Sequence, residues 1–271
     1  MSTLTAKLFP PRPNLPDDVT TIDVLKTVAL GLMVIDHIGW LIIPEVEWFR
    51  VLGRLCVPLW FFLIGYADTR DIPKRWLYAG ILLLISNLAV GLPPLPLSVL
   101  FTMALTRLCL DPFWRAVERR PVYFWWFVLL LIFVSYATNM GVEYGTMGFL
   151  LACCGFAVRH REDVNEVFAQ TTPHRTVPEV LMIVTFLAYG LLQSMIFGFS
   201  MLGVMVVLAG LIGEYFVLQH FTVRTLPGTS SKPSAPMIKF FGRYTLELYV
   251  IHLLVLKCVF GLHQLAVYLI R

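Results

Sequence analysis

Charged side chains are scarce in this sequence. Asp, Glu, Lys and Arg make up 14% of the 271 residues, whereas hydrophobic residues make up 58%; soluble domains are about one quarter charged and half apolar. At this length a water-soluble fold needs more polar surface than the chain can supply. The composition therefore excludes a soluble globular domain, a disordered chain and a nucleic-acid binder with a basic face, so we expect no nucleic-acid partner.

Familiar catalytic and binding motifs are absent as well. The sequence has no P-loop, no glycine-rich dinucleotide motif, no H-E-x-x-H and no G-x-S-x-G, which argues against ATP-driven pumping, nucleotide redox chemistry and serine hydrolysis. The five cysteines contain no C-x-x-C pair and lie in or beside apolar runs. We expect them to be buried thiols rather than disulfides or zinc ligands, and we predict no metal site.

What the chain does have is a series of long apolar runs, which predict an all-α, polytopic transmembrane helix bundle. A membrane-spanning helix needs roughly 17–25 apolar residues and satisfies its own backbone hydrogen bonds. We predict nine spans: Val24–Ile43, Gly53–Tyr66, Trp76–Val90, Leu97–Leu110, Val122–Ala137, Tyr144–Val158, Val180–Ile196, Ser200–Gln219 and Phe240–Phe260. The second and fourth of these are short and can be re-entrant, and Gly261–Ile270 can form an interfacial helix.

The basic residues lie in alternate loops between these runs. Lys and Arg precede the first span and follow the second, fourth, sixth and eighth, whereas the intervening loops are poor in them. Basic loops stay in the cytoplasm, so this pattern places the N-terminus there and the C-terminus outside. We expect residues 1–21, which include four prolines, to form a flexible cytoplasmic tail, and residues 22–271 to form one transmembrane domain in contact with membrane lipids.

Ionisable residues inside the apolar runs mark the candidate site, because each costs about 2.5–3.5 kcal/mol to insert at the centre of a span. Asp36 and His37 are adjacent in the first span and point about 100° apart on a helix. His37 can act as a general base. Arg54 opens the second span at a similar depth and is the obvious partner of Asp36. The alternative is an ion pair that only locks two helices together.

Further candidates lie later in the chain. Glu143 precedes the sixth span on the same side as Asp36 and can hold a substrate amine, although a solvated loop acid is the more common outcome. In the ninth span Arg243 can pair with Glu247, whereas Tyr249 and His252 share another face. For His252 a structural hydrogen bond and a catalytic or channel-lining role remain equal alternatives. We include Arg243, Tyr249 and His252 with Glu143 as candidate substrate-binding residues.

Several motifs resemble the TraX family of F-pilin acetylases. The similarity is specific over residues 22–71, looser to residue 158 and thin beyond. The last helix, from Gly242 to His252, is similar to that of the wider transmembrane acyltransferase group. The matching segments are Ile22–Lys26, Ile35–Gly39, Arg50–Pro58, Gly65 with Thr69 and Arg70, and Glu143–Gly148, where Glu143 replaces the family's Asp.

The resemblance implies a multi-pass protein of a bacterial cytoplasmic membrane that moves an acetyl group from acetyl-CoA to the N-terminal amine of a processed pilin. His37 would take the amine proton with Asp36 orienting it, and Arg54 or a helix dipole would steady the oxyanion. An acetyl-His37 intermediate stays open. Basic residues at the inner face would hold the phosphates of coenzyme A, although positive-inside bias explains them equally: Lys26, Arg70, Lys74, Arg75 and Arg107.

Two other functions remain open. The protein can acylate a glycan or a lipid, which changes the acceptor but not the site. It can also be a non-enzymatic pilin-assembly or proton-coupled transport protein that uses Asp36 and His252 as a relay. A transporter would more often contain inverted repeats with broken helices, and the sequence shows no such pair. The oligomeric state is not predicted.

Overall fold

The structure is a computed structural model that describes residues 15–169 and 176–270. Within these residues the fold is helical, with two isolated bridges, Thr20 to Thr225 and Leu97 to Val142, and no strand. The all-α prediction is therefore confirmed. The helices are α2 (Thr21–Leu41), α3 (Glu47–Gly53), α4 (Cys56–Tyr66), α5 (Lys74–Ala89), α6 (Val99–Arg119), η1 (Pro121–Tyr123), α7 (Phe124–Phe133), α8 (Ser135–Asn139), α9 (Gly145–Arg159), α10 (Arg161–Val167), α11 (Val177–Phe197), α12 (Met201–Leu218), α13 (Ala235–Arg243) and α14 (Thr245–Ile270).

Five helical segments of the described chain are long and apolar enough to cross a membrane, and two further apolar helices, Pro121–Phe133 and Gly145–Arg159, are shorter. These lengths define a helical membrane protein. Nine spans and a cytoplasmic N-terminus stay predictions. The five segments are Thr21–Leu41, Glu47–Tyr66, Val177–Phe197, Met201–Leu218 and Thr245–Tyr268.

Four predicted spans have wrong boundaries. The second begins at Glu47 rather than Gly53 and is bent where α3 meets α4. The fourth continues to Arg119, because Pro112 is accommodated inside α6 and the charged residues after it lie on the same helix. The fifth, Val122–Ala137, is interrupted at Val134, between α7 and α8. The ninth is divided between α13 and α14, and α14 runs unbroken through Gly261, so Gly261–Ile270 is not a separate interfacial helix.

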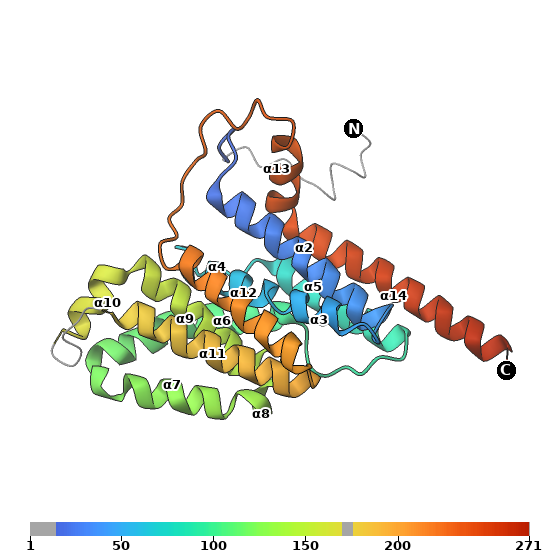
Figure 1. The fold of residues 1–271 in the computed structure, drawn as a ribbon, viewed down its shortest axis with the longest axis horizontal. Helices are drawn as coiled ribbons and strands as arrows, with labels where there is room; N and C mark the ends of the chain where they lie inside the picture. Colours follow the sequence, from blue (N-terminus) through green and yellow to red (C-terminus); the bar gives the residue numbers. More distant parts are fainter. Residues whose placement is uncertain (1–14, 170–175, 271) are drawn as a thin grey trace.

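The centre of the bundle is α4. All of its residues except Trp60 are buried, as expected for a helix that is apolar on every side. It packs most extensively against α9 and also against α2 and α6. Helices α11 and α12 form an antiparallel pair joined at Gly198, whose φ of +62° ends α11 in the left-handed conformation that glycine adopts without strain. In Figure 1 the C-terminal part of α14 projects beyond the other helices.

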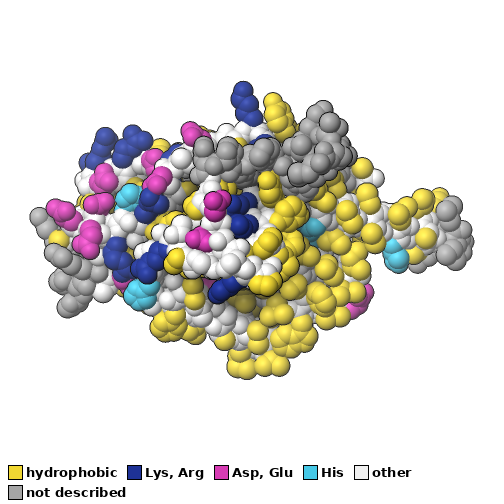
Figure 2. Space-filling model, turned by 90° about the horizontal axis from the view of Figure 1, so that it is seen from above, with side chains coloured by type: hydrophobic (Ala, Val, Ile, Leu, Met, Phe, Trp, Pro, Cys, Tyr) yellow, Lys and Arg dark blue, Asp and Glu magenta, His cyan; other side chains and the backbone are white. Residues whose placement is uncertain are grey.

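Polar and apolar side chains are segregated on the surface. Figure 2, which views the molecule from the α13 side, shows Lys, Arg, Asp and Glu side chains over this face and hydrophobic side chains toward the projecting end of α14. The exposed residues of that end include Val259, Leu262, Leu265 and Tyr268. Large apolar residues exposed in this way are expected where a helix faces lipid.

Candidate active site

A buried ion pair joins α2 to the bend between α3 and α4. Arg54 donates from Nε to Asp36 Oδ1 at 3.1 Å and also donates to Asp36 Oδ2. Arg50 donates to Asp36 Oδ2 at 2.9 Å. Asp36 and Arg54 are 4% and 3% exposed. The predicted pairing of Asp36 with Arg54 is confirmed, and Arg50 is a second cation that the sequence prediction did not include.

The bend itself positions Arg54. Gly53 lies directly against Asp36, where a Cβ atom would overlap the Asp36 side chain, so only glycine allows α3 to approach α2 this closely. Pro58 has no N–H to donate to the Arg54 carbonyl four residues earlier. That carbonyl instead accepts a 2.7 Å hydrogen bond from the Tyr189 hydroxyl on α11. Gly53 and Pro58 therefore hold Arg54 at the junction of three helices.

The remaining donors of Arg54 organise a second set of side chains. Its Nη1 donates to Tyr144 Oη at 3.1 Å and to Gln193 Oε1 at 3.3 Å. The guanidinium groups of Arg54 and Arg50 lie 4.8 and 4.5 Å from the centre of the Phe197 ring, a geometry typical of cation–π contacts. Residues from α2, α3, α11 and the N-terminal end of α9 thus meet around the Asp36–Arg54 ion pair.

His37 is oriented by another histidine and not by Asp36. His37 Nδ1 lies 2.8 Å from His252 Nε2, and His252 Nδ1 lies 2.9 Å from the Leu248 carbonyl oxygen. The prediction that Asp36 orients His37 is wrong, because neighbouring side chains on a helix diverge and Asp36 is occupied by two arginines. Of the two alternatives for His252, the structure shows the hydrogen bond, and it links His252 to the candidate base.

This chain of contacts assigns the tautomers of both rings. The Leu248 carbonyl only accepts, so His252 Nδ1 carries a proton. In neutral His252 the Nε2 atom is then the acceptor, and His37 Nδ1 must donate to it. His37 Nε2 is left with its lone pair, and it has no hydrogen-bond partner among residues 15–169 and 176–270. That lone pair is what a general base needs.

Two cavities meet at these residues. The larger, of about 900 Å³, and the smaller, of about 240 Å³, are both lined by Asp36, His37, Glu143 and Tyr144. The larger cavity extends past Tyr249 toward the start of α2, whereas the smaller extends toward Trp40 at the end of α2. His37 therefore borders two spaces that lead in opposite directions along α2.

Glu143 lies in the loop before α9 and is held against the start of α6. Its Oε2 accepts a 2.7 Å bond from the Val99 N–H, and its carbonyl accepts a 2.6 Å bond from the Thr102 hydroxyl. Burial raises the pKa of the Glu143 carboxyl to about 7, although the Val99 hydrogen bond and Arg54 oppose this change. Glu143 is therefore not a solvated loop acid and lies beside His37 in both cavities.

The far end of the larger cavity is basic. Three of the five predicted coenzyme-binding residues, Lys26, Arg75 and Arg107, line it, and Arg159 and Arg243 line it too. Arg107 lies 4.6 Å from the centre of the Trp76 ring, and its buried Nε has no hydrogen-bond partner in the described part of the chain.

The other two predicted coenzyme-binding residues, Arg70 and Lys74, do not line either cavity among the described residues. Arg70 forms a 2.8 Å ion pair with Asp111 on α6 and also donates to the Ala67 carbonyl, so its guanidinium is already bonded within the protein. Lys74 begins α5, directly after Pro73. The basic end thus contains three of the five predicted residues, together with Arg159 and Arg243, which were not predicted to bind the coenzyme.

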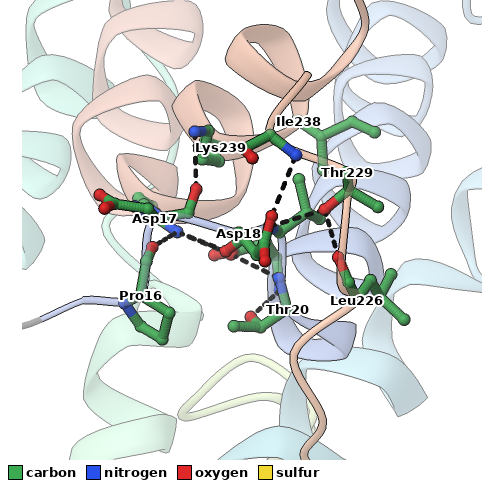
Figure 3. Close-up of polar contacts among 12 residues, drawn as sticks. Pro16, Asp17, Asp18, Thr20, Leu226, Thr229, Ile238 and Lys239 are labelled. Carbon is green, nitrogen blue, oxygen red and sulfur yellow. Dashed lines mark hydrogen bonds and ion pairs between the residues drawn. The ribbon is translucent and has the colours of Figure 1, made fainter. Parts of the chain in front are cut away.

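Arg243 is held at this end by the segment that precedes α2. It donates to the carbonyls of Pro16 and Asp18 at 2.6 and 3.2 Å and to Asp23 Oδ2 at 3.3 Å. Figure 3 shows the same segment, with Asp17 and Asp18 beside Lys239 and Thr229; Lys239 Nζ donates to the Asp17 carbonyl at 2.8 Å. Residues 1–14 of the predicted tail lie outside the described residues. Arg243 therefore lies at the basic end of the larger cavity and not at the His37 end.

The sequence analysis did not identify two ionisable residues that have buried polar atoms. Lys257 on α14 is 3% exposed and donates to the Leu83 carbonyl at 3.1 Å and to Ser86 Oγ at 2.8 Å. Glu214 on α12 has a buried Oε2 with no partner among the residues the structure describes. Both lie within apolar runs, and the rule that identified Asp36 applies to them equally. No group of three or more His, Cys, Asp or Glu in the described ranges could hold a metal ion.

The fold and this geometry define a class: a helical membrane protein with an ionic, histidine-containing site buried among its helices. Residues 21–260 match the family described as TraX protein, and the chain belongs to this family.

Individual relatives match over about half of the chain. It is 27% identical to Protein TraX of Escherichia coli over 159 residues, which cover 54% of this chain and 60% of that protein. It is 28% identical to Uncharacterized protein RP591 of Rickettsia prowazekii (strain Madrid E) over 141 residues, 52% of this chain and 56% of that protein. The matches thus span less than two thirds of either relative. No solved structure matches the chain.

Proposed function

We propose that this protein is a multi-pass acetyltransferase of a bacterial inner membrane, which moves the acetyl group of acetyl-CoA to the N-terminal amine of a conjugative pilin. The single observation that carries the proposal is that His37, with its Nε2 lone pair free, borders both cavities. One cavity suits a donor and the other an acceptor. The resemblance to the F-pilin acetylase family supplies the identity of the two substrates.

The larger cavity fits the donor in charge and in length. Its basic end would bind the phosphates of acetyl-CoA through Lys26, Arg75 and Arg107, because guanidinium groups bind phosphate bidentately. Lys26 and His37 are eleven residues apart on α2, which is roughly 16 Å along a helix axis. The pantetheine arm would cover this distance and bring the thioester to His37.

The smaller cavity fits the end of a peptide. It combines polar groups, Asn87 and Gln193, with apolar residues such as Leu92 and Ile196, and its volume of about 240 Å³ admits little more than one or two residues. Asn87 Oδ1 is buried with no partner among the described residues, so an N–H of the acceptor can bind there. A cytoplasmic N-terminus would place this cavity on the outer side, where a membrane-held pilin presents its new terminus.

The chemistry is direct transfer. The amine nitrogen attacks the thioester carbonyl carbon, and the carbonyl electron pair moves to oxygen. His37 Nε2 accepts the amine proton, and His252 Nε2 stabilises the resulting imidazolium by accepting the hydrogen bond from His37 Nδ1. The C–S bond then breaks, and the thiolate takes the proton from His37. Asp36 holds Arg50 and Arg54 in place and does not itself move a proton.

A transfer assay tests the proposal. The full chain in lipid nanodiscs is incubated with radiolabelled acetyl-CoA and a synthetic pilin N-terminal peptide. We expect label in the peptide, no label in the same peptide with a blocked N-terminus, and loss of transfer in His37→Ala. His263→Ala, which changes an exposed histidine of α14, is the matched control. Label in a lipid or glycan acceptor instead would assign the same site to another substrate, and no transfer to any acceptor would refute the proposal.

A further inference from the structure

We propose that Tyr144 is a catalytic residue: its hydroxyl donates a hydrogen bond to the oxyanion that forms on the thioester carbonyl oxygen. The inference deepens the proposed function and rests on it. Three observations carry it: the position of Tyr144 between the two cavities, its hydrogen bond from Arg54, and its backbone conformation.

Tyr144 occupies the point where the acyl group has to lie. It borders both cavities together with His37. An acyl carbon attacked by an amine in the smaller cavity, with its thioester in the larger one, has to sit at this junction. A donor at the junction can reach the carbonyl oxygen, whereas a donor deeper in either cavity cannot.

The hydrogen-bonding of Arg54 leaves the Tyr144 proton available. Arg54 Nη1 donates to Tyr144 Oη at 3.1 Å, so the hydroxyl oxygen is the acceptor in this contact. The hydroxyl proton has no acceptor among the residues that the structure describes. A guanidinium that donates to a hydroxyl oxygen makes its O–H a stronger donor, because successive hydrogen bonds polarise one another.

Arg54 itself is poorly placed to bind the oxyanion. Four hydrogen bonds already leave its guanidinium, two to Asp36 and one each to Tyr144 and Gln193. A guanidinium has five N–H groups, so almost all are engaged before any substrate arrives. Tyr144 therefore transmits the positive charge of Arg54 to the cavity.

The backbone of Tyr144 holds the ring in this position. Its φ of +65° makes it the one described non-glycine residue with a positive φ. This conformation costs about 1–3 kcal/mol in a non-glycine residue and persists where the surroundings enforce it. Here Asn139 Oδ1 accepts the Tyr144 N–H at 2.7 Å. Conformations of this kind occur preferentially at functional sites.

In the reaction Tyr144 keeps its proton. As the amine nitrogen bonds to the carbonyl carbon, the C=O electron pair moves to oxygen, which then accepts the stronger hydrogen bond from Tyr144. The amine proton goes to His37, and the bond to sulfur breaks as the carbonyl re-forms. Tyr144 thus stabilises the intermediate and is unchanged after each transfer.

Tyr144→Phe in nanodiscs tests the inference, with Tyr215→Phe as the control. Tyr215 is a half-buried tyrosine of α12 that lines neither cavity. We expect kcat for acetyl transfer to fall about 100- to 1,000-fold in Tyr144→Phe, as for loss of one oxyanion donor. KM for both substrates should stay near that of the wild type, and Tyr215→Phe should keep most of its kcat.

Two results would overturn the inference while leaving the proposed function intact: equal kcat losses in the two variants, or a raised KM with an unchanged kcat in Tyr144→Phe. If Tyr144→Phe does not fold, 3-fluorotyrosine incorporated at position 144 keeps the hydroxyl and strengthens it as a donor. We then expect kcat to rise, and an unchanged or lower kcat would refute the role. Absence of transfer by the wild type with every acceptor would instead refute the proposed function.

Discussion

Replacing His252 by Phe tests how the site prepares its base. In the folded protein His252 Nε2 accepts the His37 Nδ1 proton at 2.8 Å, and the Leu248 carbonyl fixes the His252 ring. Phe keeps a ring of similar size but removes the acceptor. The His37 Nδ1–H would then be left unpaired, and the tautomer that carries its proton on Nε2 becomes competitive.

The size of the effect follows from the missing hydrogen bond. A buried donor without a partner costs about 1–3 kcal/mol, and each 1.36 kcal/mol is a factor of ten. The fraction of His37 with a free Nε2 lone pair, and with it the rate of transfer, should therefore fall roughly 5- to 150-fold. His252→Gln, whose carboxamide oxygen can still accept from His37, should lose less.

The assay is single-turnover acetyl transfer in nanodiscs, with enzyme in excess over acetyl-CoA and saturating peptide, so that product release does not limit the rate. His263→Phe, an exposed histidine on the same helix, controls for loss of an imidazole from α14. Wild-type rates for His252→Phe, in a preparation in which His37→Ala is inactive, would refute the tautomer argument.

Three further predictions concern the surroundings of the site. Asp36→Asn should lower the free energy of unfolding by about 3–5 kcal/mol in detergent micelles, because the buried Arg54 and the partly buried Arg50 lose their counter-charge. Asp68→Asn removes a carboxylate whose side chain is 70% exposed and should cost less than about 1 kcal/mol. Equal losses in the two variants would contradict the buried pair. Burial raises the pKa of Glu143 from 4.5 to about 7, so the folded protein binds this proton more tightly than the unfolded chain and stability should fall as pH rises between these values. Glu143→Gln should remove that slope, and an identical slope in the variant would exclude Glu143 as its cause. Arg107→Ala should raise KM for acetyl-CoA about 10- to 100-fold at constant kcat. Arg115 lines neither cavity, so Arg115→Ala should leave KM unchanged. Similar increases of KM in the two variants would indicate a general charge effect.

The helical class was predictable because apolar run length determines it, but the ends of the helices were not. The bend between α3 and α4 places Arg54 inside a 20-residue segment, Glu47–Tyr66, whose first third reads as a loop because of Glu47 and Arg50. Arg50 is neutralised by Asp36, which a hydropathy window cannot register. Similarly, Gly261 does not interrupt α14, since the apolar residues around it continue the helix.

For the site, residues that are costly in lipid were identifiable, but most of their partners were not. The cost of burying Asp36 and Arg54 predicted that each needs the other, and they pair. The contact between His37 and His252 joins positions 215 residues apart, which no spacing rule relates. Tyr144 and Gln193 carry no charge, so nothing in their residue type distinguishes them before the helices are assembled. The same insertion cost applies to Lys257, so this residue was also identifiable from the sequence.

The position of bound acetyl-CoA tests the central claim most directly, and a cryo-EM map of the protein in nanodiscs with a non-hydrolysable acetyl-CoA analogue would show it. The account predicts phosphate density beside Arg75 and Arg107 at the basic end of the larger cavity, and the acyl carbonyl between His37 and Tyr144. Coenzyme density elsewhere, with the larger cavity filled by lipid acyl chains, would contradict it.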